Sequence, residues 1–150
     1  MPLSLLPTGV APVGPCPAVL VPLLEARVCA GFPSPADDYS HRRIDLNELL
    51  IQRPSATFFI RASGESMDGA KKSTITDGDL LVVDRSREPQ DGNIVVATVN
   101  NEQTVKRFRR RGRRVWLEPE NEQFPVIELR GDDELVIEGV VCARITQFIW

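Results

Sequence analysis

The chain has 150 residues, of which 42% are hydrophobic and 26% charged, and its formal net charge is −3. This size and composition predict one globular domain whose core needs neither disulfides nor a metal. The small net charge gives no global sign of a nucleic-acid or membrane surface. Three widely spaced cysteines and one histidine argue against a disulfide framework and a His-rich metal site. No metal or other cofactor is therefore expected.

The first 40 residues differ in composition from the rest of the chain. They hold eight of the 12 prolines and no charged residue before Glu25. Such a segment predicts an extended arm over residues 1–40, followed by a domain over residues 41–150. Within it, residues 20–32 could pair with a sheet or lie in a groove. No Lys or Arg precedes the apolar run 18–24, and no run approaches the roughly 20 residues of a membrane span. A cytoplasmic protein without a membrane partner is expected.

Residues 45–51 predict one or two helical turns, with Asp45 as the N-cap and Glu48 three residues later. From Ser55 onward the pattern is that of short strands separated by turn residues. Strands are expected at 57–62, 80–84, 93–99, 103–108 and 114–119, with one or two more in 135–150. Asn100-Asn101 predicts a hairpin turn, and Gly139 a bulge or bend. The fold class is therefore mostly β, a compact antiparallel domain.

One strand-to-loop segment carries a candidate nucleophile. Ser66 lies between Gly64 and Gly69, which suit a tight turn with exposed backbone N–H groups for an oxyanion hole. A serine hydroxyl needs a base, and His41 lies in a polar stretch typical of a solvated surface. Lys106 is the other candidate, because alternation in strand 103–108 places it on the same face as Phe108. Burial there would lower the lysine pKa by the roughly three units that base catalysis requires.

These segments together resemble the UmuD branch of the LexA-type self-cleaving peptidases. The resemblance is carried by GFPSPADDY (31–39), RIDLNELLIQRPSATFFIRASGESM (43–67), DGDLLVVD (77–84), DGNIVVATVNNEQTVKRF (91–108) and EGVV (138–141). It implies the β fold of LexA C-terminal and signal-peptidase-like domains. It also implies Ser66 as nucleophile, Lys106 as general base, and the backbone N–H groups of Glu65 and Ser66 as the oxyanion hole.

The resemblance places self-cleavage at Ala30–Gly31, within the arm. Gly31 has no side chain to obstruct attack, and Pro33 and Pro35 favour the extended conformation in which peptides add to a sheet edge. The UmuD branch usually has Cys-Gly at this bond, whereas Ala-Gly is typical of LexA. The segment MDGAKKSTITDGD after Ser66 is also longer than the usual turn of the family.

The same resemblance implies a role in the bacterial SOS response to DNA damage. Cleavage would be stimulated by RecA filaments on single-stranded DNA, and the product would form a homodimer that joins a UmuC-type Y-family translesion polymerase. Alternatives are a LexA-like repressor, a signal-peptidase-like membrane enzyme and a non-enzymatic polymerase-binding β module. Thirty Pro-rich residues do not suit a helix-turn-helix, so no sequence-specific DNA binding is expected.

A run of arginines lies between residues 107 and 114, near Phe108 and Trp116. Such a cluster with aromatics is one signature of nucleic-acid binding. The acidic residues Glu118, Glu120 and Glu122 follow it, so the favoured interpretation is a solvated hairpin. An acidic partner surface remains the alternative.

Overall fold

The computed structural model describes residues 17–24 and 41–149. They belong to two compact units, one ending at Leu49 and the other beginning at Leu50. The predicted cleavage bond, Ala30–Gly31, lies outside the described residues, and the predicted domain boundary at residue 40 stays a prediction. None of the helices in the described ranges is long and apolar enough to cross a membrane.

The first unit contains a two-stranded antiparallel sheet and a short helix. β1 (Val21–Leu24) pairs with β2 (His41–Ile44), and α1 (Leu46–Leu50) follows directly. The Asp45 carboxylate accepts a hydrogen bond of 2.8 Å from the backbone N–H of Asn47. This contact confirms Asp45 as the helix cap. Strand β2 was not predicted, because its polar sequence HRRI lacks the apolar alternation of a half-buried strand.

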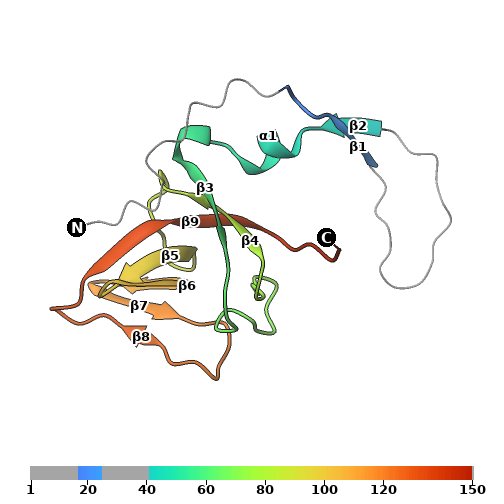
Figure 1. The fold of residues 1–150 in the computed structure, drawn as a ribbon. Helices are drawn as coiled ribbons and strands as arrows, with labels where there is room; N and C mark the ends of the chain where they lie inside the picture. The colour runs from blue at the N-terminus through green and yellow to red at the C-terminus, as the bar shows by residue number, and fades with distance from the viewer. Residues whose placement is uncertain (1–16, 25–40, 150) are drawn as a thin grey trace. The chain divides into compact units, whose positions relative to one another are not determined.

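The second unit is a seven-stranded sheet in the order β3-β4-β9-β5-β6-β7-β8, with every neighbouring pair antiparallel (Figure 1). It confirms the mostly β, antiparallel fold class. The single-turn helix η1 (Pro54–Ala56) leads into it. Its strands are β3 (Thr57–Arg61), β4 (Leu80–Asp84), β5 (Ile94–Val99), β6 (Glu102–Arg111), β7 (Arg114–Glu118), β8 (Ile127–Glu128) and β9 (Leu135–Ile145).

Local backbone features follow the predicted turn residues. Asn100 and Asn101 have φ of +48° and +68° and join β5 to β6 directly. Both positive values fit the type I′ turn that matches the twist of a hairpin. The β5–β9 register shifts where Val96 pairs with Gly139 and Ala97 with Ile137, which confirms the bulge. A Cβ on Gly139 would lie 2.6 Å from a Val83 methyl carbon, so only glycine fits there.

Two apolar clusters form the core of the sheet unit. One contains Met67, Ile75, Leu81, Val83 and Val96, and therefore joins the segment after Ser66 to strands β4 and β5. The other contains Val95, Ala97, Phe108, Leu117 and Val140. β6 contributes Phe108 to this second cluster, two residues beyond Lys106. The core thus reaches both segments that carry the predicted dyad.

Candidate active site

The segment around Ser66 is a loop that follows β3 and is fixed at several points. We call residues 63–67 the Ser66 loop. At its start, Gly64 has φ of +89°, a value that favours glycine, and its N–H donates to Asp77 Oδ1 at 2.7 Å. Met67 is buried in the core and accepts a hydrogen bond of 2.9 Å from the Ile75 N–H. Ser66 is held between these two anchors.

The long segment after Ser66 closes on itself. Because the Ile75 N–H bonds to the Met67 carbonyl, residues 68–74 leave the loop and return to its base. The Thr74 hydroxyl donates to the Gly69 carbonyl, and the Gly69 N–H donates to the same hydroxyl at 3.1 Å. The extra length is therefore accommodated as a separate turn beyond Met67.

Lys106 of β6 is in direct hydrogen-bond contact with Ser66. Its Nζ lies 2.8 Å from Ser66 Oγ, 2.8 Å from Thr104 Oγ1 and 3.1 Å from the Val105 carbonyl oxygen. The residue is only 7% exposed, and burial lowers the pKa of its amine from the usual 10.5. A neutral amine at this distance can accept the hydroxyl proton of Ser66.

Burying this lysine costs stability when it is protonated. Its pKa is lower in the folded than in the unfolded chain, so the unfolded state binds more protons between the folded pKa and 10.5. Stability should therefore rise with pH through that window. We expect Lys106→Met to have a higher melting temperature than wild type at neutral pH. The difference should vanish above pH 10.5, where the lysine is neutral in both the folded and the unfolded chain. A melting temperature that is lower than wild type at every pH would contradict the expectation.

The peptide group between Glu65 and Ser66 is held through its carbonyl oxygen. The Glu65 carbonyl accepts bonds from the Asp68 N–H at 3.0 Å and from Asn121 Nδ2 at 3.1 Å. No described peptide bond is cis, so the Ser66 N–H points away from that carbonyl across the same planar peptide. Among the described residues no acceptor takes this N–H. It is free to donate to a developing oxyanion.

Glu120, whose carboxylate is buried, contacts the Ser66 loop. The Ser66 carbonyl accepts hydrogen bonds from the N–H groups of Glu120 and Asn121, at 3.0 and 3.1 Å. The Glu120 side chain is 1% exposed and pairs with Arg107, whose Nε lies 2.5 Å from its Oε1. Lys71 approaches the second carboxylate oxygen at 3.3 Å. Arg107 follows Lys106 in β6, so Glu120 links the strand of the proposed base to the loop of the proposed nucleophile.

Gly69 packs directly against this link. A Cβ at this position would overlap the Glu120 carbonyl oxygen and lie 2.9 Å from the carbonyl carbon. These are backbone atoms, so no side-chain rotation can relieve the overlap. Gly69→Ala should therefore destabilise the fold by about 1–3 kcal/mol and slow cleavage by moving Ser66. Chemical denaturation would measure the first effect, and Gly131→Ala is the matched control, because nothing lies within 4 Å of its Cβ position. Equal stability of the two variants would contradict this packing argument.

A cleft of about 190 Å³ opens beside Ser66. Its walls come from the end of β3, the Ser66 loop, Ile75 and the start of β6, and its lining residues include Ile60, Ala62, Met67, Thr104 and Val105. β3 is an edge strand, since β4 is its only neighbour among the described strands. An extended peptide can pair with such an edge and place its side chains in the adjoining cleft.

The structure thus brings together Ser66 and Lys106, which the sequence singled out. The oxyanion hole formed by the N–H groups of Glu65 and Ser66 stays a prediction. His41 lies on β2 in the other unit. Sequence reasoning missed Asp77, Glu120 and Asn121. It treated Glu120 only as an acidic neighbour of the arginine run, because no local pattern shows that its side chain is buried against Arg107.

Comparisons with known proteins agree with this geometry. Residues 22–142 match the family model described as Peptidase S24-like. Protein ImpA of Escherichia coli is 49% identical over 120 residues, which cover 80% of this chain and 79% of that protein. Protein MucA of Salmonella typhimurium is 48% identical over 122 residues, 81% of each chain. LexA repressor 1 of Pseudomonas syringae pv. tomato is 45% identical over 115 residues, 76% of this chain and 55% of the repressor.

Proposed function

Because the chain belongs to the Peptidase S24-like family, in its UmuD branch, and is an autocatalytic serine peptidase, we propose that Ser66 and Lys106 form the dyad that cleaves its own Ala30–Gly31 bond. The observation that carries this proposal is the 2.8 Å contact between Lys106 Nζ and Ser66 Oγ at a buried amine whose pKa is lowered. The role in SOS mutagenesis follows from the family.

The chemistry is acyl transfer. Neutral Lys106 removes the Ser66 proton as Oγ attacks the Ala30 carbonyl carbon, and the N–H groups of Ser66 and Glu65 stabilise the oxyanion. The protonated lysine then gives its proton to the leaving amine of Gly31. Water hydrolyses the resulting ester at Ala30 with the same lysine as base, which restores Ser66.

The outer edge of β3, which pairs with no other described strand, would be the place where the arm binds. The segment around Ala30 would pair with β3 as an added strand, so that its backbone is fixed and the scissile carbonyl lies at Ser66. The small side chain of Ala30 suits a shallow cleft, and Gly31 leaves the carbonyl open to attack. An arm tethered to its own domain has a high effective concentration, so the fraction of time it is bound sets the rate.

The setting we propose is the bacterial cytoplasm after DNA damage. RecA filaments on single-stranded DNA would stimulate cleavage by favouring the bound arm. The product, residues 31–150, would act as a homodimer with a UmuC-type Y-family polymerase. Support comes from similarity to ImpA and MucA over about four fifths of the chain.

The direct test follows the fragments by intact mass spectrometry. Purified protein held at a series of pH values should release a fragment ending at Ala30 and one beginning at Gly31. The rate should rise with pH and level off above the folded pKa of Lys106, because the neutral amine is the active form. Ser66→Ala should release neither fragment. Cleavage at another bond would refute the assignment of Ala30–Gly31, and cleavage by Ser66→Ala would refute the nucleophile.

A further inference from the structure

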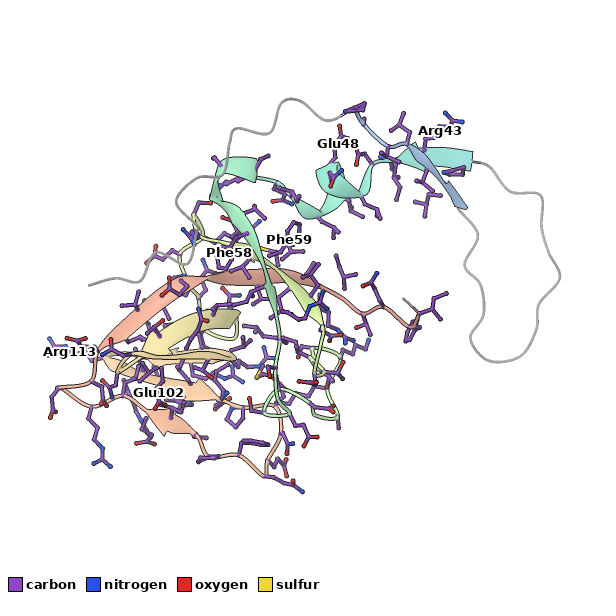
Figure 2. The ribbon with its side chains drawn as sticks, in the orientation of Figure 1. Arg43, Glu48, Phe58, Phe59, Glu102 and Arg113 are labelled. Carbon is purple, nitrogen blue, oxygen red and sulfur yellow. The ribbon has the colours of Figure 1, made fainter. Side chains whose placement is uncertain are left out.

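The β6–β7 hairpin ends in an arginine-rich tip that the peptidase chemistry does not use. We define the arginine tip as Arg110, Arg111, Arg113 and Arg114, which surround the turn at Gly112. All four are exposed. Figure 2 labels Arg113 at the margin of the sheet unit, far from Phe58 and Phe59 of β3. Five residues of strand separate Lys106 from Arg111, about 17 Å at the usual rise, so the tip is remote from the cleft.

Most arginines nearer the cleft have acidic partners, whereas the tip has an excess of positive charge. Arg107 pairs with Glu120, and Arg109 with Glu118 at 2.8 Å and Asp91 at 3.6 Å. At the tip, Arg114 pairs with Glu128 at 2.5 Å. No described acidic side chain forms an ion pair with the remaining three arginines of the tip. The neighbouring glutamates therefore do not neutralise it.

The tip is also electrostatically unfavourable for the isolated protein. Arg111 and Arg114 are direct cross-strand partners, and like charges placed opposite each other destabilise a hairpin. A bound anion would relieve this repulsion. Two of the guanidinium groups are positioned by aromatic rings, Arg110 over Phe108 at 5.4 Å and Arg114 over Trp116 at 5.2 Å from the ring centre. These contacts hold cations at the surface in defined positions.

We propose that the arginine tip binds the phosphate backbone of single-stranded nucleic acid without sequence preference. The planar guanidinium group binds phosphate in a bidentate manner, and every cation of the tip is an arginine. Arg114 keeps a side chain that is 64% exposed while it lies over Trp116. Its outer face can therefore stack with an unpaired base, as guanidinium planes do in single-strand recognition. An acidic peptide offers carboxylates but no such planar rings, so the geometry favours nucleic acid.

The test measures fluorescence anisotropy of a labelled oligothymidylate of about 20 nucleotides, longer than a typical single-strand site. The full chain should bind it, and binding should weaken steeply between about 50 and 200 mM salt. The variant Arg111→Gln/Arg113→Gln should bind the oligonucleotide more weakly. The plot of the logarithm of its binding constant against the logarithm of salt concentration should be less steep, by about 1.4, or roughly 0.7 for each lost phosphate contact. Arg85→Gln/Arg130→Gln changes the net charge equally at other exposed sites and should keep the wild-type slope.

Three outcomes would overturn the proposal. They are no binding of the oligonucleotide at low salt, equal loss in the two double variants, and a polyglutamate peptide that binds the tip as tightly as the oligonucleotide. The last result would instead identify an acidic protein surface as the partner. Thermal melting would confirm that both variants fold. Both should release the arm at the wild-type rate, so a failure of this proposal is distinguishable from a failure of the dyad.

Discussion

Lys106→Ala should lower the rate of self-cleavage by about a hundredfold to ten-thousandfold, the usual contribution of a general base. The substitution removes the amine that lies 2.8 Å from Ser66 Oγ and leaves that hydroxyl without a base. The rise of the wild-type rate with pH should disappear as well, because the group that titrates is gone. Fragment release followed by mass spectrometry from neutral to alkaline pH would give both the rate and its dependence on pH.

The matched control is Lys72→Ala. Lys72 is exposed in the turn beyond the Ser66 loop and forms no ion pair with the described residues. Its removal is the same Lys-to-Ala change outside the candidate site and should leave the cleavage rate and the pH profile unchanged. If Lys106→Ala cleaved as fast as Lys72→Ala, the dyad would be refuted and the non-enzymatic β module favoured.

Glu120→Gln should have the next largest effect. It keeps the size of the side chain but leaves Arg107, which is 14% exposed, without its buried counter-charge. Removing one partner of a buried ion pair costs about 3–5 kcal/mol. Denaturant titration should show a loss on that scale. At temperatures where the variant is folded, cleavage should still be slower, by up to about a hundredfold, because the Ser66 carbonyl is held by the backbone at residues 120 and 121.

Two measurements separate a positioning role from simple instability. The plateau rate of Glu120→Gln should fall while the midpoint of its pH profile stays at the wild-type value, because Lys106 keeps its own surroundings. Glu122→Gln, at a neighbouring exposed position, should change neither stability nor rate. A Glu120→Gln variant with full stability and normal cleavage would show that the buried pair does not hold the Ser66 loop.

The antiparallel β fold, most of its strands and the Asn100-Asn101 turn were predictable from the sequence. These features depend on local signals: apolar runs, alternation and residues that tolerate positive φ. Lys106 and Phe108 were correctly placed on one face because alternation is a local property of a strand. β8 (Ile127–Glu128) was missed, since two residues carry no periodic signal, and β2 was missed because its residues are polar.

The pairing of Ser66 with Lys106 required more than local pattern. Each residue alone resembles an ordinary loop serine or surface lysine. From the sequence, only the resemblance to a known family suggested that the two residues act as a pair. Only the tertiary structure shows the 2.8 Å contact and the burial that lowers the lysine pKa. It alone also shows the contacts of Glu120 with the Ser66 loop and that, within the described residues, three arginines of the tip form no ion pair. Local sequence thus determined the strands and turns. The active-site geometry depends on contacts between residues up to 56 positions apart, because burial and charge pairing arise only when distant segments pack together.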